Sequence, residues 1–302
     1  MSTSHEGIPP MLARDGYVPG VPCWIDTSQD DPQAAVAFYS GLFGWEFEDA
    51  MPPDSPGHYF IARLRGGDVA AVGSSPPDGS TMPPAWNTYI WVDSADETAS
   101  KVAEAGGRVV TEPFDVMEAG RMAACLDPEG AAFLIWQARG HKGAQMVNEP
   151  GSLNFNTLNS HEPDAAKAFY GRVFGWDTLD GAGAGMWRLP GYGDFLELRD
   201  PALRTRMVES GAPEGFEDVV AALNPMAEDR SGLGPHWSVT FAVDDADATA
   251  ETAVKLGGRV NVAPFDAPWV RMTIIADPQG ATFTASKFVP ENQDLAASAM
   301  AQ

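Results

Sequence analysis

Few side chains in this chain are placed to do chemistry, and Glu197 and His236 are the two best candidates for acid–base work. Glu197 lies in the apolar sequence Phe-Leu-Glu-Leu at 195–198, which we interpret as a strand. A carboxylate among apolar side chains suits a general acid or base, whereas strand alternation equally allows it to point into solvent. His236 precedes Trp237 and is either a base in a binding site or a structural histidine at a strand start. Both are therefore candidate catalytic residues.

Amide and tryptophan side chains form a second group of candidates. Asn87, Asn154 and Asn156 occur in segments with strand character, where Asn is disfavoured. A buried amide needs hydrogen-bond partners, so these residues either orient a polar ligand or bind neighbouring backbone. Tryptophans near strand starts and on last strands suit a flat or aromatic ligand, although most tryptophans belong to cores. They are Trp24, Trp86, Trp91, Trp136, Trp187 and Trp237.

The sequence carries no common metal or cofactor motif. The five histidines include no pair in metal-ligand spacing. Cys23 and Cys125 have neither disulfide nor zinc-site spacing. There is no nucleophile elbow, phosphate loop or dinucleotide fingerprint. We therefore expect no metal ligand and no cofactor, with a bound divalent metal as the alternative.

The composition narrows the class of partner. The 302 residues include 19 Lys and Arg against 42 Asp and Glu, a formal net charge of −23. Such a field repels phosphate backbones and anionic lipid, so we expect no nucleic-acid or membrane partner. The sequence shows no signal peptide and no run of about 18 apolar residues, the length that a membrane span needs. These features predict a cytoplasmic protein.

The elements that must position the candidate residues occur as a repeat. Phe38–Trp45 (FYSGLFGW) and Phe169–Trp176 (FYGRVFGW) agree at five of eight positions, each at the end of an apolar helical stripe. Two further pairs of turns recur, Gly-Gly-Arg-Val at 106–109 and 257–260, and Asp-Pro-x-Gly at 127–130 and 277–280. These repeats predict an α+β domain duplicated in tandem.

The repeat divides the chain into four modules, each a strand, a helix and three strands. The predicted first strands are Val21–Thr27, Trp86–Val92, Leu153–Leu158 and a segment near Thr240. The predicted parts are an arm (1–16), a first domain (17–137), a linker (138–150), a second domain (151–287) with an insertion (199–235), and a tail (288–302). Within the insertion, Glu217–Leu223 can form a helix. Such a long connection is either a lid or a plain surface loop.

These repeated motifs resemble those of the vicinal oxygen chelate superfamily, the glyoxalase, bleomycin-resistance and extradiol dioxygenase fold. The tandem Phe-Gly-Trp form is similar to an actinobacterial subgroup often labelled hydroxylase, which includes a mycobacterial secreted antigen. The resemblance implies paired βαβββ modules whose mixed sheets curl into open cups. It also implies that metal-dependent members take their ligands from the first and last strands of each module.

Carrying those ligand positions over to this sequence gives two predicted cups that each combine the two domains. Cys23, Ala71, Ser238 and Thr284 form one cup, and Asn87, Leu134, Asn154 and Glu197 form the other. The resemblance thus implies a single good ligand, Glu197, and a poor site for a divalent metal.

We therefore predict a protein that binds a small organic molecule, amphipathic or aromatic, without a catalytic metal. It either sequesters a metabolite of secondary metabolism or resistance, or acts on it with Glu197 or His236 as acid or base. The alternative is a divalent-metal-dependent glyoxalase-like lyase, or an oxygenase or hydroxylase. We expect a monomer or weak homodimer. The predicted ligand-binding residues are Trp24, Asn87, Leu134, Trp136, Asn154, Asn156, Trp187, Trp237, Ser238 and Thr284.

Overall fold

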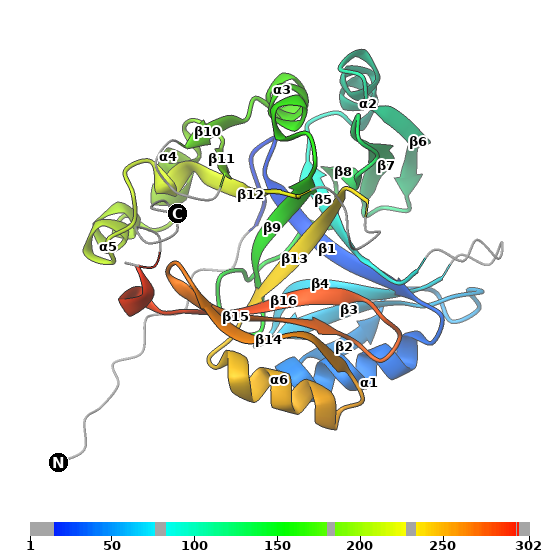
Figure 1. Cartoon of the computed structure of the whole chain (residues 1–302). Coiled ribbons are helices and arrows are strands. Elements are labelled where there is room, and N and C mark those ends of the chain that lie inside the picture. The colour runs from blue at the N-terminus through cyan, green and yellow to red at the C-terminus, as the bar shows by residue number, and fades with distance from the viewer. Residues whose placement is uncertain (1–14, 76–82, 180–184, 228–233, 294, 296–302) are drawn as a thin grey trace.

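Two curled eight-stranded sheets, one for each half of the chain, make up the structure (Figure 1). The computed structural model describes residues 15–75, 83–179, 185–227, 234–293 and 295. The predicted arm lies almost wholly outside the described residues, as do most of the tail and part of the insertion. No described helix is long and apolar enough to cross a membrane.

The first domain joins two modules edge to edge. Its sheet has the order β2-β3-β4-β1-β5-β8-β7-β6, in which the first strands of the two modules, β1 and β5, pair antiparallel at the centre. The elements are β1 (Pro22–Gln29), α1 (Pro32–Phe43), β2 (Glu46–Asp49), β3 (Tyr59–Leu64), β4 (Gly67–Ser74), β5 (Trp86–Trp91), α2 (Ala95–Glu104), β6 (Arg108–Val116), β7 (Gly120–Leu126) and β8 (Ala132–Ala138).

The second domain repeats this order as β10-β11-β12-β9-β13-β16-β15-β14. Its modules begin with β9 and β13, which also pair antiparallel. The elements are β9 (Leu153–Ser160), α3 (Pro163–Phe174), β10 (Asp177–Leu179), β11 (Gly185–Arg188), α4 (Tyr192–Glu197), α5 (Leu203–Glu209), η1 (Phe216–Asp218), β12 (Val219–Pro225), β13 (His236–Ala242), α6 (Ala246–Lys255), β14 (Arg259–Ala267), β15 (Val270–Ala276), β16 (Thr282–Phe288) and η2 (Pro290–Asn292).

The third module departs from the sequence prediction. Residues 195–198 were expected in a strand, but α4 contains Glu197 and ends there. The last strand of the module is β12, so the helix expected at Glu217–Leu223 is wrong. The extra residues therefore lie inside the module, between β11 and β12, where the first domain has only a short turn between β3 and β4.

Each hydrophobic core combines residues of both domains. One core joins the α1 module to Val239, Phe241 and Phe283 of the second domain. The other joins residues of β5 and β8 to the α3 module. Figure 1 shows the consequence, because α1 lies beside α6 and α2 beside α3. The two domains therefore stabilise one another by hydrophobic burial.

The repeated Phe-Tyr-x3-Phe-Gly-Trp phrase locks the domains together. Tyr39 Oη donates to Asp277 Oδ2 (3.0 Å), and Tyr170 Oη donates to Asp127 Oδ2 (3.2 Å). Each aspartate lies in the Asp-Pro-x-Gly turn of the other domain, and its Oδ1 accepts three backbone N–H groups of its own turn. Trp176 Nε1 also crosses the interface, to the carbonyl oxygen of Gly20 (2.7 Å). The repeated motifs are thus structural.

Candidate active site in the first domain

The concave face of the first sheet brings its first and last strands together at one place. Asp26 on β1 pairs with Ala71 on β4 and, on its other side, with Asn87 on β5. Tyr89 on β5 likewise pairs with Leu134 on β8. Because paired residues share a face of the sheet, these side chains converge on the centre of the cup.

Asp26 is the centre of a buried hydrogen-bond cluster. Only 5% of the residue is exposed. Its Oδ1 accepts from Asn87 Nδ2 at 2.8 Å, and its Oδ2 accepts from Tyr89 Oη at 2.6 Å and Tyr59 Oη at 3.0 Å. Burial raises the pKa of Asp26, and the three donors only partly oppose that effect. A buried carboxyl with a raised pKa is well suited to proton transfer.

The two phenols that face Asp26 remain protonated. Burial and the neighbouring carboxylate raise the pKa of Tyr59 and of Tyr89 well above the ordinary value. Tyr59 also accepts a hydrogen bond from Trp24 Nε1 at 3.0 Å. A continuous chain of donors therefore runs from Trp24 through Tyr59 to Asp26.

An aromatic group closes one end of this cup. His141, from the linker, packs edge-on against Trp24 with ring centroids 4.3 Å apart, and against Trp136 at 5.8 Å. The His141 Nε2 atom is buried and has no hydrogen-bond partner among the described residues. Burial lowers the pKa of His141, which favours the neutral imidazole. A buried polar atom without a partner is uncommon in a finished core and is expected where a ligand binds.

Half-buried side chains line the other side of the cup. Ile61, Met122 and Leu134 are half-buried apolar residues on the concave face, and Asn87 beside them is also half-buried. An apolar surface with one amide and a deeper acid can hold a flat molecule by its faces and by one polar edge.

The cup of the second domain has different chemistry. The corresponding paired positions are Thr157 with Ala222, and Thr240 with Thr284. Beside them Ser238 Oγ accepts from Asn159 Nδ2 at 3.1 Å. No carboxylate occupies these four positions, so this cup offers the aliphatic hydroxyl groups of threonine where the first offers the carboxyl group of Asp26 and the phenol of Tyr89.

The predicted site residues are divided among several places. Trp24, Asn87, Leu134 and Trp136 meet in the first cup, as described above. His236, Ser238 and Thr284 lie on the concave face of the second cup, where His236 Nδ1 contacts the carbonyl oxygen of Gly234 at 2.8 Å. The predicted cups that combine the domains are wrong, because each sheet contains two consecutive modules.

The other predicted residues lie outside both cups. Trp187 and Trp237 are buried in the core shared with the first domain, where Trp237 Nε1 donates to Tyr170 Oη at 2.9 Å. Asn156 accepts from Thr88 Oγ1 between the sheets (2.9 Å). Asn154 donates to Asn148 Oδ1 (3.1 Å) at the start of β9.

Glu197 is engaged in an ion pair. It lies at the end of α4 and contacts Arg204 of α5. The guanidinium of Arg204 also contacts Asp194 at 2.8 Å and Glu217 at 2.9 Å. The structure therefore places Glu197 in a charged cluster formed by α4, α5 and η1.

The sequence prediction missed Asp26, Tyr59, Tyr89 and His141. The predicted first-strand position was Cys23, three residues before Asp26 and completely buried. Alternation from Trp24 points to Asp26, since residues i and i+2 share a face. Nothing in the sequence alone places Tyr59 or His141 beside them.

The donor set does not fit a resident divalent metal. The four paired positions of the first cup hold one carboxylate, and Asp26 already accepts from three donors. Within the described part of the chain, no three His, Cys, Asp or Glu side chains are grouped to hold a metal ion. Divalent transition metals in proteins take several imidazole, thiolate or carboxylate ligands.

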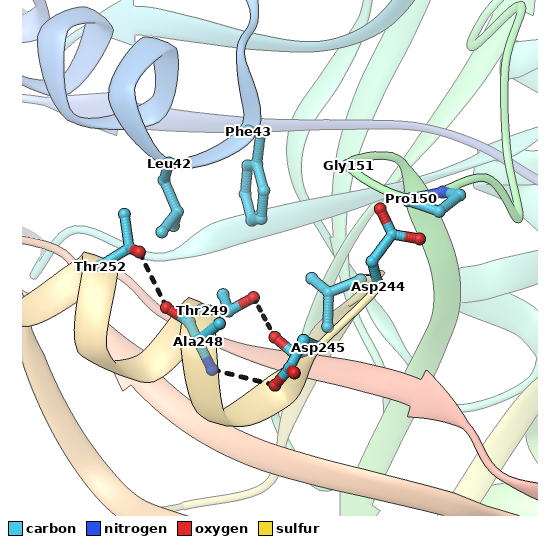
Figure 2. A pocket seen from close by; sticks show the side chains of 10 residues that line it. Leu42, Phe43, Pro150, Gly151, Asp244, Asp245, Ala248, Thr249 and Thr252 are labelled. Atoms are coloured by element: carbon cyan, nitrogen blue, oxygen red, sulfur yellow. Dashed lines mark hydrogen bonds between the residues drawn. The ribbon is translucent and has the colours of Figure 1, made fainter.

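A second hollow, of about 260 Å³, lies between α1 and the start of α6 (Figure 2). Its polar groups serve the helix itself. Asp245 Oδ1 caps the helix by accepting from Ala248 N at 3.0 Å, and Thr249 and Thr252 donate to backbone carbonyl oxygens one turn earlier. We interpret this hollow as a structural groove.

Comparison with known proteins agrees with this architecture. The sequence profile of the Glyoxalase/Bleomycin resistance protein/Dioxygenase superfamily matches residues 24–135 and 152–284. The chain therefore belongs to this superfamily.

Two relatives are similar over nearly their whole length. The protein named “Putative glyoxylase CFP32” of Mycobacterium bovis is 40% identical over 285 residues, which cover 93% of this chain and 100% of that protein. The anthracycline biosynthesis protein DnrV of Streptomyces peucetius is 35% identical over 284 residues, covering 89% and 93%.

A solved structure shows the same fold at low identity. The Mn(II)-bound glyoxalase from Novosphingobium aromaticivorans matches with a TM-score of 0.56 and 16% identity, covering 92% of this chain and 83% of its own. The homoprotocatechuate 2,3-dioxygenase of B. fuscum gives a TM-score of 0.56 and 13% identity, covering 93% and 73%.

Proposed function

We propose that the protein binds a flat, aromatic or amphipathic small molecule in the cup of the first domain, and acts on it without a catalytic metal. The observation that carries the proposal is the buried Asp26 carboxyl beneath half-buried Asn87, at the position where the first and last strands meet. The name of the relative DnrV supports the ligand class, because anthracyclines have a flat aromatic body. Both cores combine both domains, so the proposed working unit is one chain.

In this proposal the aromatic body of the ligand packs against Leu134 and the ring of Trp136. Its polar edge lies against Asn87 and Tyr59, two half-buried residues of the cup. A ligand hydroxyl gives its proton to Tyr59 Oη, while Tyr59 passes its own proton to the Asp26 carboxylate. The reverse transfer returns the proton elsewhere on the ligand, so the net change is a proton shift that needs no oxidant.

Asp26 replaces Glu197 and His236 as the proposed acid or base. Glu197 is engaged with Arg204 on the insertion, and His236 lies in the cup that lacks a carboxylate at its paired positions. The Tyr59 and Tyr89 hydroxyl groups donate to Asp26 and so stabilise its carboxylate form, while burial favours its protonated form, so Asp26 can take up and release a proton.

The alternative is a metal-dependent lyase or oxygenase of the same superfamily, which the name of the relative CFP32 favours. It predicts activity that disappears with a chelator and returns with a divalent ion. Our proposal predicts the same ligand affinity before and after chelation.

The test is calorimetric titration of chelator-treated protein with an anthracycline. Leu134→Trp fills the first cup, and Thr284→Trp adds the same bulk at the matching position of the second cup. We expect Leu134→Trp to weaken binding by about tenfold or more, equivalent to roughly 1.4 kcal/mol, and Thr284→Trp to change it by less than about twofold. Equal loss in both variants, or binding only after a divalent metal is added, overturns the proposal.

A further inference from the structure

A pocket of about 200 Å³ lies in the second domain, apart from the Asp26 cup. The pocket is partly open to solvent, and its lining comes from the chain around the start of β1, the end of the linker, the start of β9, the segment with α4, α5 and η1, and the start of β12. The segment between β11 and β12, which contains α4, α5 and η1, is also the main departure from the internal repeat, because β3 and β4 of the first domain join through a short turn. The residues that the second domain has in addition to the first therefore line this pocket.

The lining of this pocket combines apolar and aromatic side chains with polar groups, the apolar surface being the larger part. Phe155, Phe216 and Val220 contribute apolar surface, together with Met207 from the insertion. An apolar cavity of about 150 Å³ accommodates a benzene ring, so 200 Å³ suits one ring or two fused rings.

The polar groups of the lining select a neutral ligand. Asn148 and Asn154 are among the lining residues and are hydrogen-bonded to one another, and the remaining donors and acceptors of their amides can bind a hydroxyl or carbonyl group. Among the described residues that line the pocket, Glu217 is the one charged side chain, and Arg204 Nε contacts its Oε1 at 2.9 Å. An anionic ligand meets a carboxylate and no free cation, and a cationic ligand must compete with Arg204.

α5 lies over the pocket with few buried contacts, whereas Tyr192 anchors α4 in the hydrophobic core. α5 has no buried residue, and Leu198 and Val208 are 82% and 75% exposed. α4, α5 and η1 are held to one another largely through Arg204, which contacts Asp194, Glu197 and Glu217. Partly exposed ion pairs of this kind contribute little stability, and a helix with few buried contacts moves away at low cost.

We propose that this pocket is a separate binding site for a neutral aromatic molecule of one or two rings, entered by displacement of α5. It does not depend on the function proposed for the first domain, because the two sites share no residue.

The experiment is calorimetric titration with 2-naphthol, and with 2-naphthoate as the anionic probe of similar size. Met207→Trp fills the pocket, whereas Val208→Trp places the same side chain on the outer surface of the same helix. Leu196→Trp and Leu198→Trp form a second matched pair on and beside α4. All four positions are half-buried or exposed, so the fold is expected to tolerate the substitutions.

We expect 2-naphthol to bind, and 2-naphthoate to bind at least about tenfold more weakly. Met207→Trp and Leu196→Trp should each weaken 2-naphthol binding by about tenfold or more, with their partner variants within about twofold of the wild type. Leu134→Trp, in the first cup, should leave this binding unchanged. The proposal is overturned if the filling variants bind like their surface partners, or if Leu134→Trp abolishes the binding.

Discussion

Tyr39→Phe tests whether the repeated phrase holds the two domains together. The Tyr39 ring is fully buried, and its hydroxyl donates to Asp277 Oδ2 at 3.0 Å. The Tyr39 hydroxyl oxygen also accepts a hydrogen bond from Trp86 Nε1 at 3.1 Å. Burial, with Asp277 nearby, raises the pKa of Tyr39 well above its usual value, so the hydroxyl stays protonated across the working range.

The expected loss follows from these two contacts. Removing a hydrogen bond to a charged acceptor costs about 1.5–3 kcal/mol. Trp86, 4% exposed, loses its acceptor, and an unsatisfied buried donor costs about 1–3 kcal/mol. Asp277 keeps the Gln29 Nε2 contact at 2.8 Å, which limits the loss on that side. We therefore expect a total of about 2–4 kcal/mol.

Urea unfolding followed by tryptophan fluorescence and by far-ultraviolet circular dichroism measures this change. Both signals should show one shared transition, shifted to lower urea, because each core contains modules of both domains. Tyr170→Phe is the matched variant, since its hydroxyl makes the same contacts with Asp127 and Trp237. A loss below about 0.5 kcal/mol in both variants, or two separate transitions, refutes the interdomain lock.

Asp26→Asn should weaken ligand binding yet raise stability at neutral pH. A buried acid with a raised pKa stabilises the fold while protonated and loses that contribution as pH rises through the folded pKa, so the advantage of the variant in urea unfolding should grow as pH rises above the ordinary aspartate pKa; a constant difference contradicts this. Burial also raises the pKa of Cys23, and raises that of Cys125 to about 12, so neither thiol should react with iodoacetamide at pH 8 in the native state. Rapid alkylation of the native protein argues against the burial of the two thiols. Gly107→Ala should lower the free energy of unfolding in urea by about 1–3 kcal/mol, because a Cβ added at this position would lie 2.7 Å from the Leu126 carbonyl oxygen; an unchanged midpoint contradicts that close approach.

The architecture could be predicted because the repeated motifs are local. Asp31 and Pro32 start α1 and Gly44, at φ 70°, ends it, and Pro163 and Gly175 do the same for α3. Such rules act within a few residues, so the sequence is sufficient to predict these helices and count the modules.

The position of the site could not be predicted in the same way. The register of β1 against β5 shifts between Pro22 and Trp24, and a sequence without its strand pairing does not reveal such an irregularity. Glu197 was misplaced because a short apolar run cannot be assigned to helix or strand by periodicity alone. His141 reaches Trp24 from the linker through tertiary structure alone.

The most direct test of the account is a crystal structure of the protein grown with zinc and an anthracycline. We predict density for the ligand in the first cup, with its polar edge within hydrogen-bond distance of Asn87 and Tyr59, and no metal bound at Asp26. Density for a zinc ion coordinated by Asp26 and the ligand, or a ligand lying over Thr240 and Thr284, would contradict the account.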